Sequence, residues 1–274
     1  MSTSLDNTAV TSDNDEFARQ WQEWKANRER DLAEPYGWLA LVSLEWLADS
    51  PTEYAGLPGR WWQDADAAYF DPRGADVTHE GEPITDVRRF ELVNSGPGTR
   101  VVAGEVEIEV ARRSGYLIRV HDPKAPVLHD FTGVPAYAPD RAWVLRGTFE
   151  PFDEPHPTTV GAVVEGLSHV YLAPGVVRFS HDGAEHTLTA FNGRTDGLSI
   201  LFTDRTSGVT TYPANRSLPV ARPAADGTVL LDFNRAVNLP CAFTDYATCP
   251  LPPAGNHLPF AVEAGEQLPY ERQR

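Results

Sequence analysis

The stretch from Glu105 to Val120 reads Glu-Val-Glu-Ile-Glu-Val-Ala-Arg-Arg-Ser-Gly-Tyr-Leu-Ile-Arg-Val. Glutamate alternates with an apolar residue over its first half, which is the period of a β-strand that buries one face. Ser114-Gly115 is a turn signal, and apolar residues alternate again from Tyr116 to Val120. The stretch therefore predicts a β-hairpin with one face exposed to water.

Short strands of this kind continue through the second half of the chain. Asp-Gly dipeptides at 182–183, 196–197 and 226–227 mark tight turns between them. Because no helical pattern separates these strands, they predict antiparallel sheets in a sandwich or a barrel, and not a parallel α/β sheet. The expected strands cover residues 142–149, 159–165, 168–172, 176–180, 185–191, 198–203, 208–212 and 228–233.

The front of the chain has a different pattern. Apolar residues at helical spacing between Phe17 and Leu32 predict a helix from about 14 to 33. The run from Trp38 to Ala48 suits either a second buried helix or a buried strand. The fold class is therefore mainly β, with one or two N-terminal helices. Residues 1–12 predict a disordered tail, and the remainder predicts one β-rich domain over 13–274 or two lobes over 13–150 and 151–274.

Composition limits the partners. Of 274 residues, 39 are acidic and 23 are Lys or Arg, so the formal net charge is -16. An acidic surface repels phosphate backbones and anionic lipids, which argues against nucleic acid and membrane partners. Without a leader pattern or a long apolar run, we expect a soluble cytoplasmic protein. Its oligomeric state stays open.

A second stretch, the closing segment from Asp232 to Glu266, is dense in polar groups. It begins at the end of an apolar strand, where side chains often reach a ligand at the rim of a sheet. One interpretation makes Asp232 or Glu263 an acid/base group and Arg235 an anion clamp. In the other, the same groups bond the backbone or one another. The candidate ligand-binding residues are Asp204, Asn234, Asn238, Tyr246, Asn256, Glu263 and Glu266, and the candidate catalytic residues are Asp232, Arg235 and Arg216.

The hairpin before the closing segment supplies two of these candidates. Asp204, Thr206 and Gly208 are typical of a tight turn between two strands, so a structural role is favoured for Asp204. Arg216 lies beyond the second expected strand. We expect it to meet a carboxylate of the closing segment if the two share a rim.

Cys241 and Cys249 are the chain's two cysteines, separated by seven residues. Structural zinc sites usually bring cysteine ligands in pairs about two to four residues apart, so a metal site here is the weaker alternative. Free buried cysteines are favoured, with a disulfide also open. No cofactor is expected, and no common hydrolase, nucleotide or dinucleotide motif occurs in the sequence. The His-Asp dipeptides at 121–122, 129–130 and 181–182 suggest turn or edge residues.

The closing segment resembles the end of a bacterial and archaeal family known as DUF1684, whose function has not been assigned. The similar pieces are Asp-Phe-Asn-Arg-Ala-Val-Asn-Leu-Pro-Cys-Ala-Phe at 232–243, Cys-Pro-Leu-Pro-Pro at 249–253, Asn-His-Leu at 256–258 and Ala-Gly-Glu at 264–266. The hairpin from Phe202 to Arg216 and the pieces at 37–39 and 46–47 are also similar. The family pattern differs at His257 and at 213–215. The resemblance implies one polar assembly of hairpin and closing segment, and no reaction.

Two hypotheses for function follow. In the first, a polar pocket at one rim binds a small polar molecule, with or without hydrolysing it, so the enzyme question stays open. In the second, the closing segment is a structural clasp in a non-catalytic binding or scaffold module. Breaking a buried charge pair would then cost stability.

Overall fold

The computed structural model describes residues 4–193 and 196–272, without the side chains of residues 4–12 and 271. Helix α1 (Ser4–Leu32) opens the chain, so the helix predicted from about 14 to 33 is present and begins earlier. Part of the predicted tail, residues 1–3, lies outside the described residues. The rest is mainly β, with antiparallel sheets, which confirms the predicted fold class.

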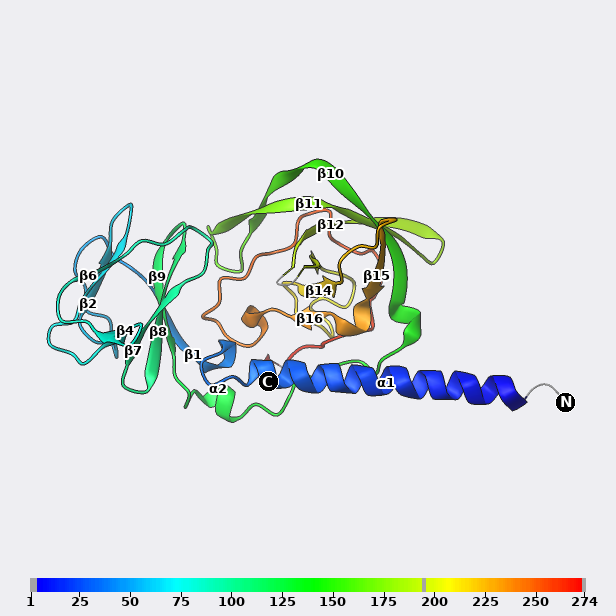
Figure 1. The fold of residues 1–274 in the computed structure, drawn as a ribbon, viewed down its shortest axis with the longest axis horizontal. Coiled ribbons are helices and arrows are strands. Elements are labelled where there is room, and N and C mark those ends of the chain that lie inside the picture. The colour runs from blue at the N-terminus through cyan, green and yellow to red at the C-terminus, as the bar shows by residue number, and fades with distance from the viewer. Residues whose placement is uncertain (1–3, 194–195, 273–274) are drawn as a thin grey trace.

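Two sheets pack together in the first half of the chain (Figure 1). A six-stranded sheet has the order β1-β9-β8-β7-β4-β5, and a three-stranded sheet has the order β2-β3-β6. Their shared core includes Trp61 stacked on Phe70, with ring centroids 4.2 Å apart. The strands are β1 (Leu41–Trp46), β2 (Arg60–Gln63), β3 (Ala68–Asp71), β4 (Thr78–His79), β5 (Glu82–Pro83), β6 (Arg88–Phe90), β7 (Thr99–Ala103), β8 (Val106–Arg113) and β9 (Gly115–His121).

The second half of the chain forms one curved sheet of seven strands, in the order β15-β10-β11-β12-β13-β14-β16. Figure 1 shows it bending around the closing segment, with α1 along one side. We call the two halves the N-terminal and C-terminal lobes. The strands are β10 (Val144–Gly161), β11 (Ser168–His181), β12 (Ala184–Asn192), β13 (Leu198–Phe202), β14 (Arg216–Val220), β15 (Thr228–Asp232) and β16 (Val237–Asn238).

Short helical turns connect these elements. They are η1 (Trp38–Ala40), α2 (Pro126–His129), η2 (Arg141–Trp143), η3 (Phe233–Arg235), η4 (Pro240–Ala242) and η5 (Tyr270–Arg272). None of the helices in the described part of the chain is long and apolar enough to cross a membrane.

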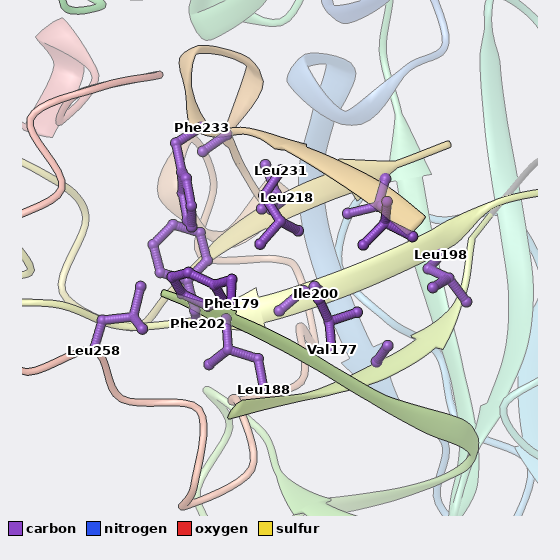
Figure 2. Packing of buried hydrophobic residues seen from close by; sticks show 14 of the residues in the cluster. Val177, Phe179, Leu188, Leu198, Ile200, Phe202, Leu218, Leu231, Phe233 and Leu258 are labelled. Atoms are coloured by element: carbon purple, nitrogen blue, oxygen red, sulfur yellow. The ribbon is translucent and has the colours of Figure 1, made fainter. Parts of the chain in front are cut away.

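The core of the C-terminal lobe draws on both the sheet and the closing segment. Phe233 packs against Phe179 and Phe202, with ring centroids 6.1 and 5.6 Å apart (Figure 2). Leu258 and Val262 of the closing segment belong to the same buried cluster. The closing segment is therefore part of the core, and its apolar residues fix where its polar residues lie.

The predicted hairpin at 105–120 is confirmed as β8 and β9, with a positive φ of 66° at Ser114 in the turn. Its predicted wet face is wrong in part, because the Arg119 side chain is only 1% exposed and lies over Trp38. The run from Trp38 to Ala48 resolves as η1 followed by strand β1. The alternation of glutamate and apolar residues thus identified the strand, but not what covers its second face.

The hairpin region near 208–212 differs from the prediction. Residues 203–211 form turns, in which the backbone N–H groups of Val209, Thr210 and Thr211 donate to the Thr206 carbonyl. The second strand is β14, which begins only at Arg216. The predicted pieces at 168–172 and 176–180 belong to one longer strand, β11, and of the piece at 159–165 only residues 159–161 lie in a strand, at the end of β10.

Candidate functional site

Asp204 and Arg216 form a buried ion pair beside the β13–β14 hairpin. Arg216 Nη2 lies 2.5 Å from Asp204 Oδ2, and the two side chains are 1% and 0% exposed. The other carboxylate oxygen, Oδ1, accepts hydrogen bonds from the backbone N–H and the hydroxyl of Thr206, each at 2.5 Å. Asp204 therefore builds the turn that its sequence predicts, and it also neutralises Arg216.

Arg216 reaches the closing segment through backbone carbonyl oxygens, and not through a carboxylate of that segment as the sequence suggested. Nη2 donates to the Val262 carbonyl at 3.0 Å, and Nη1 donates to the carbonyls of Ala264 and Glu266. Burial lowers the pKa of Arg216, and the charge of Asp204 opposes that effect. One guanidinium thus ties three carbonyls of the closing segment to the hairpin.

Glu266 continues this network toward helix α1. Its Oε2 accepts the backbone N–H of Asn238 at 2.6 Å, and its Oε1 accepts Arg28 Nε at 3.1 Å. Arg28 Nη2 donates to the Asn238 carbonyl at 2.9 Å, and Asn238 Nδ2 donates to the Gln267 carbonyl at 2.8 Å. We call the group of Arg28, Asp204, Arg216, Asn238 and Glu266 the clasp. It joins the hairpin, the closing segment and α1.

The side-chain amides of two further asparagines each accept from and donate to the backbone of another segment, as a paired strand does. Asn234 accepts from the Asp140 N–H at 2.8 Å and donates to the Asp140 carbonyl at 2.9 Å. Asn256 accepts from the Thr189 N–H at 2.8 Å and donates to the carbonyls of Thr189 and Leu201 at 2.9 and 2.8 Å. Both side chains are buried. These amides therefore join segments far apart in the chain.

Asp232 and Arg235 are more exposed. Arg235 Nε lies 3.1 Å from Asp232 Oδ2, and the side chains are 38% and 22% exposed for Arg235 and Asp232. Arg235 Cζ lies 5.8 Å from the centroid of the Trp24 ring, so the pair sits beside α1. Asp232 Oδ1 accepts the Asn234 N–H at 3.2 Å and caps η3. This pairing agrees with the second interpretation of the sequence, in which these groups bond the backbone or one another.

The structure places the predicted site residues in several locations. Asp204, Arg216, Asn238 and Glu266 share the clasp, and Asp232, Asn234 and Arg235 lie around η3. Tyr246 and Glu263 are exposed, and Asn256 bonds between β12 and β13. A surface hollow of about 350 Å³ lies in the N-terminal lobe and is lined by His79, Glu80 and residues 82–88, which are not among the predicted residues.

Cys241 and Cys249 are free and buried. They pack with Ala247 against Trp38 and Tyr212, among others. Within residues 4–193 and 196–272, no group of three or more His, Cys, Asp or Glu side chains is arranged to hold a metal ion. The two thiols therefore contact aromatic side chains and each other.

A buried charge cluster in the N-terminal lobe was missed by the sequence reasoning. Glu109 accepts two hydrogen bonds from Arg119, at 2.9 Å each, and lies 3.4 Å from His121 Nε2. Burial raises the pKa of Glu109, but the hydrogen bond from His121 and the charge of Arg119 outweigh it and hold the pKa at about 2. His121 is buried and its Nδ1 lies 3.0 Å from the Gly37 carbonyl, so it is not the turn or edge residue that its dipeptide suggested.

Arg119 is the residue from which the sequence could have predicted this cluster. It interrupts the apolar second strand of the 105–120 stretch, at a position opposite Glu109 in the hairpin register. Opposite charges directly across two strands stabilise a sheet. Arg119 also lies over Trp38, 5.1 Å from Cζ to the ring centroid, and Trp38 contacts the cysteine cluster of the C-terminal lobe. The cluster therefore borders the junction of the two lobes.

The fold and these contacts define a mainly β protein with antiparallel sheets whose last segment is held by a buried polar network. The family model described as a protein of unknown function, DUF1684, matches residues 129–267, and the chain belongs to that family. The match spans the hairpin, the closing segment and the C-terminal sheet, but not the similar pieces at 37–39 and 46–47.

Among solved structures, the chain is similar to an uncharacterized protein of Haloarcula marismortui, determined by solution NMR. The two are 31% identical, with a TM-score of 0.43, over 51% of this chain and 78% of the other. The search of curated proteins found no match.

Proposed function

We propose that this protein is a non-catalytic binding or scaffold module and that the clasp has a structural role, which is to hold the closing segment on the sheet. The contacts of Arg216 support the proposal most directly. Its guanidinium is 1% exposed, pairs with Asp204 and donates to the carbonyls of Val262, Ala264 and Glu266. An arginine buried in this way holds backbone together and is out of reach of a ligand in solvent.

A catalytic role for the same residues receives less support. Acid/base and anion-binding groups must come within hydrogen-bond reach of one substrate. Arg216 lies in the buried clasp, whereas Asp232 and Arg235 pair with each other beside Trp24. The three candidate catalytic residues therefore belong to two separate networks.

The test compares Arg216→Met with Arg235→Met, which removes a guanidinium from a partly exposed pair. Urea unfolding followed by tryptophan fluorescence measures stability. Both proteins and the wild type are also incubated with p-nitrophenyl esters and p-nitrophenyl phosphate. We expect Arg216→Met to lose much of its stability, Arg235→Met to remain close to wild type, and no variant to hydrolyse these probes above background.

Two results would contradict the proposal. One is an Arg216→Met protein with wild-type stability, because the proposal requires the contacts of Arg216 to stabilise the fold. The other is hydrolysis by the wild type that Arg235→Met abolishes while remaining folded, because that outcome would make Arg235 a catalytic residue.

The exposure of Asp232 and Arg235 favours a second candidate, the binding of a small polar molecule at this pair. The pair offers an acceptor, a guanidinium and the neighbouring Trp24 ring. Thermal melting in the presence of inorganic phosphate, citrate or glucose would show this as a raised melting temperature that Arg235→Met abolishes. No shift with any of the three probes in the wild type would count against it.

A further inference from the structure

Two free thiols contact each other at the junction of the lobes. The backbone N–H of Cys241, in η4, donates to Cys249 Sγ at 3.3 Å, and the two thiols are hydrogen-bonded to each other. Their residues are 3% and 6% exposed. Cys249 also accepts the Val163 N–H at its carbonyl, at 3.0 Å, which fixes it beside the end of β10. Both thiols are therefore held in place by backbone contacts on either side.

The side chains around the thiol pair include two aromatic rings and a guanidinium. Trp38 and Tyr212 pack against it, and Trp38 lies in turn under Arg119 of the N-terminal lobe. Arg272 donates to the carbonyls of Ala242 and Cys241, at 3.3 and 3.5 Å, and pairs with Asp245. The pair thus packs against two aromatic rings and has a guanidinium near Cys241.

The two thiols differ in acidity. The hydrogen bond from Cys249 lowers the pKa of Cys241; burial opposes this, and the Tyr212 hydroxyl and the charge of Arg272 lower it further. The hydrogen bond to Cys241 and burial raise the pKa of Cys249. Burial, followed by the charge of a Cys241 thiolate, raises the pKa of Tyr212 to about 12, so its hydroxyl stays protonated and donates. A thiolate stabilised beside a protonated thiol is the arrangement of an attacking and a resolving cysteine.

We propose that Cys241 and Cys249 are a redox-active pair that hydrogen peroxide converts reversibly into a disulfide. The Cys241 thiolate attacks a peroxide oxygen, so an S–O bond forms, the O–O bond breaks, and the departing hydroxide takes a proton to become water. The Cys249 sulfur then attacks the sulfenic acid, so an S–S bond forms and the S–O bond breaks. The Cys249 proton leaves with the second water. Two electrons pass from the sulfurs to the peroxide, and a dithiol returns the pair to its reduced form.

The thiol pair and the clasp share no residue, so this proposal does not depend on the proposed function. Oxidation of the pair would tie η4 by a covalent bond to Cys249, whose carbonyl accepts the Val163 N–H just after β10, where the contact between the two cysteines now depends on hydrogen bonds and packing. Because Trp38 packs against the pair and contacts Arg119, oxidation of the two thiols would change the surroundings of Trp38 at the junction of the two lobes.

The first experiment treats the folded, full-length protein with hydrogen peroxide and analyses it by intact mass spectrometry and by thiol counting after denaturation. We expect wild type to lose two hydrogen atoms and both titratable thiols, and dithiothreitol to restore them. Cys249→Ser should instead accumulate a dimedone-reactive sulfenic acid at Cys241. Cys241→Ser should react more slowly at its remaining thiol. Wild-type thiols that survive peroxide in the folded protein, or that form only intermolecular disulfides, would overturn the proposal.

A second measurement separates the electrostatic environment of Cys241 from a general loss of folding. The rate of Cys241 alkylation by iodoacetamide is measured against pH in the Cys249→Ser background, with and without Tyr212→Phe. Loss of the Tyr212 hydroxyl should move the midpoint of the profile to higher pH. Tyr36→Phe removes a hydroxyl that donates to the Glu105 carbonyl instead, and it should leave the midpoint unchanged. An unchanged midpoint in Tyr212→Phe would contradict the role assigned to that hydroxyl.

Discussion

The buried pair of Asp204 and Arg216 allows a prediction with a definite magnitude. In Asp204→Asn the amide oxygen can still accept from Thr206, so the turn keeps its hydrogen bonds, but the negative charge opposite Arg216 is gone. Arg216 is 1% exposed and cannot recover its hydration without disturbing the closing segment. Removing one partner of such a pair costs about 3 to 5 kcal/mol.

The expected loss is large enough to measure in two ways. Urea unfolding should give a free energy of unfolding lower by about 3 to 5 kcal/mol. Since about 2 to 4 °C of melting temperature corresponds to 1 kcal/mol in a chain of roughly this size, calorimetry should show a decrease of about 6 to 20 °C. Both measurements are made at the same neutral pH for the wild type and the variant.

The matched control is Asp232→Asn. This carboxylate is also paired with an arginine, but the two side chains are 22% and 38% exposed for Asp232 and Arg235. A pair screened by solvent contributes about 1 kcal/mol or less, so the control should remain close to wild type. If Asp204→Asn lost no more stability than Asp232→Asn, burial would not be what makes the first pair important, and the reasoning behind the clasp would be refuted.

Three other predictions concern separate parts of the molecule. The folded pKa of Glu109, about 2, lies below its usual 4.5, so its carboxylate stabilises the fold fully above about pH 4.5 and loses that contribution as the pH falls through 2. The advantage of wild type over Glu109→Gln, on the order of 3 kcal/mol by unfolding at neutral pH, should therefore shrink across this range, and a constant difference would contradict it. Asn256→Ala leaves three backbone groups without their amide partner, and urea unfolding should show a loss of about 2 to 4 kcal/mol; a loss below about 0.5 kcal/mol would count against it. Disulfide formation between Cys241 and Cys249 should raise the free energy of unfolding by about 2 to 3 kcal/mol, judged by comparing oxidised with reduced protein, and no increase would indicate native-state strain.

The sequence predicts the sheets better than it predicts what covers them. Alternation from Glu105 to Val120 specifies a hairpin because the side-chain period of a strand is a local property. The burial of Glu109 and Arg119 depends on Trp38 and on the neighbouring lobe, and no local pattern contains that information. Strand β14 was missed for a related reason, since it begins with a charged residue, Arg216, that is buried only by the closing segment.

The candidate site shows the same division. The density of polar residues identified the closing segment, the resemblance to the family implied one polar assembly of that segment with the hairpin, and Arg216 does join them. The sequence did not predict that the acceptors would be carbonyls, because backbone groups are present at every position. Nor did it predict Arg28 as the partner of Glu266, since the two residues are 238 positions apart. Pairing at such distance is decided by the packing of α1.

The contribution of the closing segment to the C-terminal core has a consequence for synthesis. A ribosome makes the chain from its N-terminus, and long-range contacts must wait for the later partner to emerge. Phe202 and Phe233 belong to a cluster that also contains Leu258 and Val262, and Arg28 cannot pair with Glu266 until Glu266 has been made. Nascent chains that stop short of Val262 therefore expose part of an apolar cluster and leave Arg28 without its partner Glu266, so the lobe completes its folding only after the closing segment has been made.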